Sequence, residues 1–420
     1  MEFLTDTTTI YIALAAIFGV FMAWGIGAND VANAMATSVG SKSITIKQAL
    51  IIAAIFEFAG AYLAGGQVTE TIRNGLVDMD AFSAKPEVLV WGMLGSLLAA
   101  GTWLLVASLR GWPVSTTHSI VGAVVGFAAV GVGVDAVNWS TVGTTAVSWV
   151  FSPMISGVLA FLIFMSLQKL VLNTKNPLQN AIKYGPFYLF MVGFVLSLLT
   201  IKKGLKHVGL HLDNGMDLVL SVVVGIMIAL LGRWLISRVK FDEKVDRRSH
   251  FANVEKIFAV MMVFTASAMA FAHGSNDVAN AVGPMAAVID VAQSGVMAAK
   301  SSVPSWVLLV GAVGIVVGLA TYGYKVIQTV GNKITELTPT RGFSAEISTA
   351  MTVVMASYTG IPVSTTHTLV GAILGVGFAR GIAAIDLRVV GGIFMSWVVT
   401  LPAGALLSVI FFYLLRGIFV

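Results

Sequence analysis

Long apolar runs, separated by short polar stretches, account for most of this chain. Twelve runs stand out, at 10–27, 46–66, 88–109, 116–133, 142–172, 185–201, 216–237, 257–273, 303–330, 347–359, 363–379 and 389–418. A helix of about 20 apolar residues spans a bilayer, and within lipid an open strand would leave backbone groups unpaired. The pattern therefore predicts an all-α polytopic membrane protein with about 10–12 transmembrane segments.

Two of these runs, 142–172 and 389–418, are too long for one perpendicular crossing. A long hydrophobic segment can tilt in the bilayer. Proline can also interrupt a helix, because it lacks the backbone N–H. We therefore expect these two segments either to be tilted or to be broken at Pro153 and Pro402.

The composition supports this class and excludes several others. Of the 420 residues, 57% are hydrophobic and only 11% are charged, whereas a soluble domain is about 25% charged. Too little polar surface is present for a soluble enzyme, a disordered chain or a nucleic-acid-binding module. We expect a multi-pass protein of the cell (inner) membrane, surrounded by lipid and binding no nucleic acid. The absence of cysteine excludes disulfides and thiolate metal sites.

The charged residues indicate how the chain is oriented. The excess of 25 Lys and Arg over 20 Asp and Glu fits basic cytoplasmic loops. The stretch 238–256, with six basic and four acidic residues, is interpreted as a solvated cytoplasmic loop. Met1–Thr9 contains no Lys or Arg, so it does not form a cleavable signal peptide. We expect the first run to be a retained span with its N-terminus outside the cytoplasm.

Two motifs occur twice in the same order. GANDVANA at 27–34 returns as GSNDVANA at 274–281, and PVSTTHSIVGAVVG at 113–126 returns as PVSTTHTLVGAILG at 362–375. The offsets, 247 and 249 residues, are nearly equal and indicate a duplicated unit. We predict repeat 1 at 1–169, a connector with two spans and the charged loop at 170–256, and repeat 2 at 257–420. Such repeats are typical of transporters with a site near the bilayer midplane, and they are inverted if each has an odd number of crossings.

The first duplicated motif places a carboxylate in an apolar stretch. A charge at membrane depth costs at least about 2.5–3.5 kcal/mol and usually faces a cavity or a partner. Gly25 and Gly27, followed by Asn29 and Asp30, predict a break with a new helix resuming at Val31. Such a helix start suits an anion, and the Asp and Asn oxygens suit Na⁺. Alternatively, these polar groups only tie helices together.

The second duplicated motif predicts a helix start in each repeat. In PVSTTH at 113–118 and 362–367, proline ends the preceding helix and serine is a suitable N-cap. The consecutive hydroxyls could donate to an oxyanion, or could simply cap a buried helix end. His118 and His367 could act on the substrate or bond a neighbouring carbonyl. The glycine pairs that follow, such as Gly122 and Gly126, favour close helix packing.

Other polar residues lie in or beside apolar runs. Glu57 and Glu346 are interpreted as cation ligands or protonatable gates, with an inter-helix hydrogen bond as the alternative. Arg110 and Arg341 lie at span edges, where arginine snorkels to the interface, and are left out of the site. His273 has no histidine counterpart in the first repeat and is interpreted as a local polar contact.

On these motifs the chain resembles the inorganic phosphate transporter (PiT) family. The duplicated GANDVANA and GSNDVANA elements are that family's signature, and the PVSTTH pair supports the match. The stretch Phe56–Gly75 is similar to its sodium-coupled branch. The resemblance implies cation-driven uptake of orthophosphate, two inverted repeats and a homodimer. It places the ion and phosphate site on the Asn and Asp residues of both copies, with Glu57 and Glu346 as functional acids.

We therefore predict a sodium–phosphate symporter that works by alternating access, not an enzyme, with no cofactor and Na⁺ as coupling ion. The predicted phosphate ligands are Asp30, Asn33, Ser115, Thr116, Thr117, Asp277, Asn280, Ser364, Thr365 and Thr366. The predicted sodium ligands are Asn29, Asp30, Asn276, Asp277, Glu57 and Glu346. A proton-coupled carrier of phosphate or neutral metal–phosphate would use the same residues. An anion channel and a non-transporting receptor are further alternatives.

Overall fold

The computed structural model describes residues 7–204, 215–241, 247–295, 303–331, 337–381 and 387–419. Helices make up nearly all of these ranges, and within them the only extended pairing is an isolated bridge between Val77 and Val137. The all-α prediction is confirmed. Met1–Asp6, on which the orientation prediction depends in part, and residues 242–246 of the charged loop lie outside the described residues.

The helices follow one another in a similar order in the two halves. The first half contains α1 (Thr7–Gly40), α2 (Ile46–Ala64), α3 (Gly66–Glu70), η2 (Thr71–Gly75), η3 (Met79–Phe82), α4 (Pro86–Arg110), α5 (Thr116–Gly131), η4 (Val134–Ala136), α6 (Trp139–Leu167) and η5 (Gln168–Leu172). A hairpin of α7 (Pro177–Leu199), η6 (Thr200–Gly204) and α8 (Met216–Ser237) follows. The second half contains α9 (Arg247–Asp277), α10 (Ala279–Ser294), α11 (Ser305–Gly318), η8 (Leu319–Gly323), α12 (Tyr324–Gly331), α13 (Pro339–Thr359), α14 (Thr365–Arg380) and α15 (Leu387–Phe419).

Each of the twelve apolar runs lies almost entirely within helix. In the described part of the chain, nine helical segments are long and apolar enough to cross a membrane. Helices α5 and α14 are shorter, and α13 carries many hydroxyl side chains and Glu346. The two longest runs remain helical through Pro153 and Pro402, so of the two alternatives, tilted or broken, the break at these prolines is wrong.

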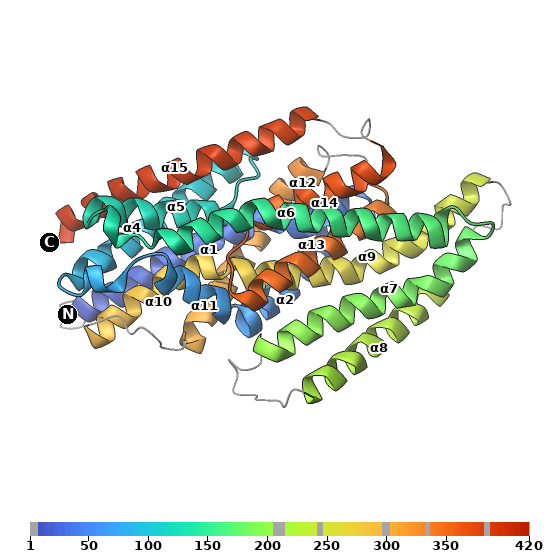
Figure 1. Cartoon of the computed structure of the whole chain (residues 1–420), viewed down its shortest axis with the longest axis horizontal. Coiled ribbons are helices and arrows are strands. Elements are labelled where there is room, and N and C mark those ends of the chain that lie inside the picture. The colour runs from blue at the N-terminus through green and yellow to red at the C-terminus, as the bar shows by residue number, and fades with distance from the viewer. Residues whose placement is uncertain are drawn as a thin grey trace.

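The two halves are packed into each other rather than side by side. Helix α1 packs on α11, and α2 packs on α9. In the same way α6 of the first half packs on α14, and α15 of the second half packs on α5. Figure 1 shows the resulting bundle, with α1 and α9 in its interior and the α7–α8 hairpin along one edge. Side chains from both halves therefore meet in the interior.

Glycines permit the closest of these contacts. A Cβ built on Gly27 of α1 would lie 1.9 Å from the Ile315 carbonyl oxygen of α11. A Cβ on Gly274 of α9 would likewise lie 2.2 Å from the Glu57 carbonyl oxygen of α2. Since real Cβ atoms do not approach an oxygen so closely, only glycine allows the backbones to meet here.

These contacts also explain a wrong prediction about α1. Gly25 and Gly27 do not interrupt the helix, because α1 runs without a break from Thr7 to Gly40. In the second copy the helix is interrupted only at Val278, which has no side-chain cap. The duplicated NDVANA motif is therefore not a helix start with Asn and Asp as caps. Its glycines are needed for helix packing, and its polar side chains lie on continuous α1 in the first copy and on either side of Val278 in the second.

The GxxxG glycines serve the packing that their spacing predicts. A Cβ on Gly375 would lie 2.0 Å from the Gly157 carbonyl oxygen of α6. A Cβ on Gly122 would lie 2.3 Å from the Leu401 carbonyl oxygen of α15. Helices α14 and α5 therefore pack directly on the proline-containing helix of the opposite half.

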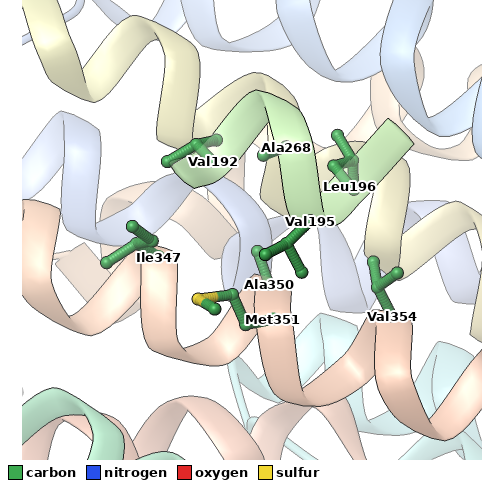
Figure 2. Close-up of a pocket in the computed structure, with 8 residues that line it drawn as sticks. All are labelled: Val192, Val195, Leu196, Ala268, Ile347, Ala350, Met351 and Val354. Atoms are coloured by element: carbon green, nitrogen blue, oxygen red, sulfur yellow. The ribbon is translucent and has the colours of Figure 1, made fainter. Parts of the chain in front are cut away.

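The α7–α8 hairpin occupies the predicted connector and packs less tightly on the bundle. A small gap of about 10 Å³ lies between α7, α9 and α13. Figure 2 shows that its lining is entirely apolar: Val192, Val195, Leu196, Ala268, Ile347, Ala350, Met351 and Val354. A buried water needs two to four polar partners, so this gap is dry and is not a binding site.

We expect Gly27→Ala to destabilise the fold, because the new methyl group would overlap the Ile315 carbonyl oxygen. Overpacking of this kind costs about 1–3 kcal/mol. Gly143→Ala is the matched control, since Gly143 lies in α6 with nothing within 4 Å of an added Cβ. The melting temperature of the purified protein in detergent measures both. Equal melting temperatures would contradict the packing role of Gly27.

Candidate functional site

Two helix starts in the interior form the framework of the site. Helix α4 ends in left-handed Gly111 (φ 64°) and α13 ends in left-handed Gly360 (φ 74°). After each short loop a serine caps the next helix. The Ser115 hydroxyl accepts from the His118 N–H at 3.2 Å, and the Ser364 hydroxyl accepts from the His367 N–H at 3.3 Å. The predicted capping is confirmed.

The two helix starts are bonded to each other. The Thr117 hydroxyl donates to the Val363 carbonyl at 3.0 Å, and the Thr366 hydroxyl donates to the Val114 carbonyl at 3.4 Å. Each threonine thus bonds the residue that precedes the capping serine of the other half. The N-terminal ends of α5 and α14 therefore meet, and both point their free backbone donors into one region.

Asparagines from α1 and α10 reach the threonines of the opposite half. Asn33 Nδ2 donates to Thr366 Oγ1 at 2.8 Å, with Thr365 Oγ1 at 3.4 Å. Asn280 Nδ2 donates to Thr116 Oγ1 at 3.2 Å. The side-chain amides thereby join the NDVANA motif of each half to the STT hydroxyls of the other.

The two duplicated aspartates are buried at the same place. Asp30 and Asp277 are exposed by 1% and 0%. Asp30 Oδ1 accepts from Asn33 at 3.2 Å, and Asp277 Oδ2 accepts from Thr365 at 3.0 Å. One ligand atom from each of Asp30, Asp277 and His273 lies within 4.8 Å of the others. Two carboxylates so close in a water-poor interior repel each other, so a cation between them is favourable.

The first asparagine of each motif holds the loop before the helix start. Asn29 Nδ2 donates to Ser108 Oγ at 3.1 Å and to the Trp112 carbonyl at 3.2 Å. In the second half the Asn276 amide contacts Ser357 Oγ at 3.2 Å in either orientation of its amide. The structure therefore brings together all the predicted phosphate ligands and four of the six predicted sodium ligands, in one connected cluster.

His273 is part of this cluster although the motifs do not include it. Its Nε2 lies 3.1 Å from Asp277 Oδ2, and its Nδ1 lies 3.2 Å from Glu57 Oε1. All three side chains are fully buried. The predicted polar contact is therefore present, and it joins Glu57 to the site through the imidazole. The available signal was the break in the repeat, where histidine replaces the isoleucine at position 26.

Glu346, the remaining predicted sodium ligand, has other partners. Its Oε1 accepts from the Thr37 hydroxyl and, at 2.6 Å, from the Ser38 hydroxyl. Its Oε2 accepts from the Thr265 hydroxyl at 2.6 Å. Thr37 is two turns beyond Asp30 on α1, about 10 Å along the helix axis. Glu346 therefore forms a second polar cluster on one side of the aspartates.

His118 and His367 lie behind the helix starts and pack on each other. Their rings have centroids 4.4 Å apart, and the His118 ring lies 3.8 Å from that of Trp149. His367 Nδ1 is 3.5 Å from the Trp149 carbonyl, which Pro153 leaves without its usual helical donor. Both histidines border a mainly apolar cavity of about 720 Å³ between α5, α6, α14 and α15. Their rings therefore contact each other and the wall of this cavity.

Comparison with known proteins agrees with this arrangement. A family model for the phosphate transporter family matches residues 26–408, which include both NDVANA motifs and both helix starts. The chain belongs to the phosphate transporter family. The resemblance inferred from the duplicated motifs is thereby confirmed, and the family and fold are those of a multi-pass membrane transporter, not of an enzyme.

Relatives within the family match the chain over nearly its whole length. A Haemophilus influenzae protein whose provisional name is phosphate permease is 52% identical over 420 residues, covering 100% of both chains. The chloroplastic inorganic phosphate transporter 2-1 of Arabidopsis thaliana is 43% identical over 96% of this chain and 72% of its own length. A solved structure of a sodium-dependent phosphate transporter is 40% identical, with a TM-score of 0.91 over 97% of this chain and 100% of that one.

The contact between Glu57 and His273 gives a testable energetic prediction. The motif offset of 247 residues places Ile26 opposite His273. Gly27 packs on the Ile315 carbonyl as Gly274 packs on the Glu57 carbonyl, so Ile315 is the counterpart of Glu57. The other half therefore has isoleucine at both positions. His273→Ile leaves the Glu57 carboxylate buried without its imidazole, which costs about 3–5 kcal/mol. The double variant Glu57→Ile with His273→Ile should lose less stability.

Melting temperatures of the single and double variants in detergent check this expectation. Ile26→Val serves as the control for a mild change at the equivalent position and should cost about 0.5–1.5 kcal/mol. If the double variant is less stable than His273→Ile alone, the two residues do not stabilise each other.

Proposed function

We propose that this member of the phosphate transporter family is a Na⁺-coupled symporter of inorganic phosphate that works by alternating access. Phosphate binds between the starts of α5 and α14, and Na⁺ binds beside it at Asp30 and Asp277. The observation that carries the proposal is the combination of two converging helix starts with two buried carboxylates in one connected cluster.

Phosphate recognition follows from the donors at the two helix starts. The N-terminus of a helix presents free N–H groups and partial positive charge to an anion. The hydroxyls of Thr116, Thr117, Thr365 and Thr366 and the amides of Asn33 and Asn280 lie at the same place. Three of these hydroxyls donate to protein acceptors in the structure, so each must turn away from its acceptor to donate to phosphate. Because no arginine is among the predicted ligands, such a site permits release of the anion into the cell.

Na⁺ binding follows from acceptor oxygens that have no hydrogen-bond donor in the described part of the chain. There, Asn29 Oδ1, Asp30 Oδ2 and Asn280 Oδ1 are buried and accept no hydrogen bond. Leaving a buried polar atom unsatisfied costs about 1–3 kcal/mol, more if it is charged. A hard cation with oxygen ligands satisfies such atoms and offsets the repulsion between Asp30 and Asp277. The similar solved structure, which is that of a sodium-dependent phosphate transporter, supports Na⁺ as the ion.

The same charges couple the two substrates. Phosphate alone would be repelled by Asp30 and Asp277, whereas bound Na⁺ neutralises them. Na⁺ therefore raises the affinity for phosphate, and phosphate raises the affinity for Na⁺ by the same factor, because coupling between equilibrium binding sites is reciprocal. His273 contacts both Asp277 and Glu57, so the charge on Glu57 also acts on the site.

Alternating access requires two halves that can exchange roles. Gly19 of α1 lies beside Met285 of α10, whereas Ser41 at the other end lies 3.3 Å from Met262 Sδ of α9. Helix α1 thus runs antiparallel to its counterpart, and in Figure 1 α1 leads away from the end of the molecule to which α10 returns. These contacts support inverted repeats, whose relative rocking would expose the site to each side in turn. The homodimer implied by the resemblance stays a prediction.

We expect purified protein in proteoliposomes to accumulate phosphate when a Na⁺ gradient is imposed. Asp30→Asn and Asp277→Asn should each lower this uptake at least about tenfold, because a charge-assisted ligand is worth about 1.5–3 kcal/mol. Asp80→Asn, at an exposed position of η3, is the matched control. Uptake driven by a pH gradient instead of Na⁺ would make the protein proton-coupled, and unchanged uptake in both variants would remove the aspartates from the site.

We expect sulfate to compete with phosphate at least about tenfold more weakly than unlabelled phosphate does. At neutral pH phosphate keeps a P–OH group that can donate to a carboxylate oxygen of the site, whereas sulfate has no donor and forgoes this hydrogen bond, at about 1–3 kcal/mol. Competition uptake at fixed Na⁺ measures the ratio. Equal competition by the two anions would show that no carboxylate accepts from the substrate.

A further inference from the structure

We propose that Arg73 and Asp290 form a latch that keeps one side of the binding site closed and therefore sets the balance between the two access states. The inference rests on the proposed transport function and names two positioning residues for it. The Arg73 guanidinium of η2 forms an ion pair with Asp290 Oδ2 of α10, and neither residue is a predicted phosphate or Na⁺ ligand.

Both side chains of the ion pair are largely shielded from solvent. The Arg73 side chain is 0% exposed and that of Asp290 is 14% exposed. Removing one partner of a buried pair strands the other charge, so the pair is stable only while η2 stays on α10. Asp290 is ten residues beyond Asn280 on α10, about 15 Å along the axis. The latch therefore lies on one side of the phosphate and Na⁺ ligands, without touching them.

The η2 turn, which carries Arg73, packs on the part of α10 between Asn280 and Asp290. A Cβ on Gly283 of α10 would lie 2.7 Å from Ile72 and 3.3 Å from the Arg73 backbone N. Gly283 is only three residues beyond Asn280. The η2 backbone is thus packed directly on α10 from the edge of the site outward. It is a single π-helical turn, a form that occurs mostly at functional positions in helices.

The same segment also holds the loop that leads to the second helix start. The Thr71 hydroxyl donates to the Gly360 carbonyl at 2.7 Å. Gly360 begins the loop that reaches Ser364, the cap of α14. Residues Thr71–Gly75 therefore connect α10, which carries Asn280, to the loop that positions Thr365 and Thr366. If η2 leaves α10, this loop loses its support on the same side.

The described residues of the other half show no equivalent ion pair at the matching positions. The motif offset of 247 residues places Ser43 opposite Asp290. Gly60 and Gly65 match Gly318 and Gly323 with an offset of 258 residues, which places Gly331 opposite Arg73. On that side Ser41 and Ser43 instead contact the Met262 sulfur at 3.3 and 3.1 Å. The Glu346 carboxylate also lies on that side, where it accepts from the hydroxyls of Ser38 and Thr265. The two sides are therefore closed by contacts of different kinds, an ion pair on one and hydrogen bonds to a carboxylate on the other.

The chain contains no cysteine, so a single introduced cysteine reports access without background. One reporter is Ala287→Cys, because Ala287 is buried one turn before Asp290 on the same face of α10. The other is Ser41→Cys, because Ser41 is buried on the opposite side of the aspartates. Each reporter is combined with the double variant Arg73→Gln and Asp290→Asn. This variant removes both charges together, so neither charge stays buried without the opposite one. The reaction rate with a bulky polar maleimide is measured on the purified full chain in detergent.

We expect the neutralised pair to raise labelling at position 287 about tenfold and to lower it at position 41, because one access state gains population from the other. Arg73→Lys, which keeps the charge, should label nearly as the unmodified pair does. Lys202→Gln with Asp217→Asn removes a 3.9 Å ion pair near the hairpin and should change neither rate. Unchanged rates at both reporters, or equal acceleration at both, would overturn the latch.

The labelling assay needs no ion gradient and no transport. If the unmodified protein fails to accumulate phosphate with Na⁺, the proposed function fails, whereas the reciprocal labelling would still be observed. If uptake is driven by Na⁺ but labelling at the two positions does not change reciprocally, the transporter assignment stands and the role of Arg73 and Asp290 is refuted.

Discussion

The proximity of two carboxylates in the interior of a membrane protein is the constraint on which the rest of the structure depends. Asp30 and Asp277 meet within 4.8 Å around His273 and are almost completely buried. Such an arrangement persists only if other groups compensate for it. Asparagine amides, threonine hydroxyls and an imidazole surround the carboxylates, and each of these polar groups comes from an element that packing brings to the centre.

The packing itself is dictated by small residues. Gly27 and Gly274 allow α1 and α9 to lie against backbone carbonyls of α11 and α2, so that the asparagines and aspartates on the following turns face inward. The glycine pairs on α5 and α14 do the same for the two helix starts. Without an apolar driving force between helices in lipid, such close backbone contacts and interhelical hydrogen bonds are what holds a bundle together.

Much of the fold and the membership of the buried polar cluster could be predicted from the sequence, because both are repeated in it. The apolar runs predict the helices, and the serine after each Pro-Val predicts the two caps, since these signals are local. The continuity of α1 could not be predicted, because Gly27 is equally compatible with a helix break and a close helix contact. Arg73 and Asp290, 217 residues apart, carry no shared motif, and only the tertiary structure shows that they meet.

The departures from the repeat have a common consequence for the proposed alternating-access mechanism. In that mechanism, symmetry alone would make the two access states equal in energy and would give neither half a distinct role. The Glu57–His273 contact replaces two isoleucines, and the Arg73–Asp290 pair replaces a serine and a glycine. Glu346 also breaks the repeat, because the motif offset of 249 residues places Leu97 opposite it. A carrier needs two states that differ by only a few kcal/mol, so that bound ligands can shift the balance. Duplication would provide two similar states, and the residues that break the repeat would provide the free-energy difference between them.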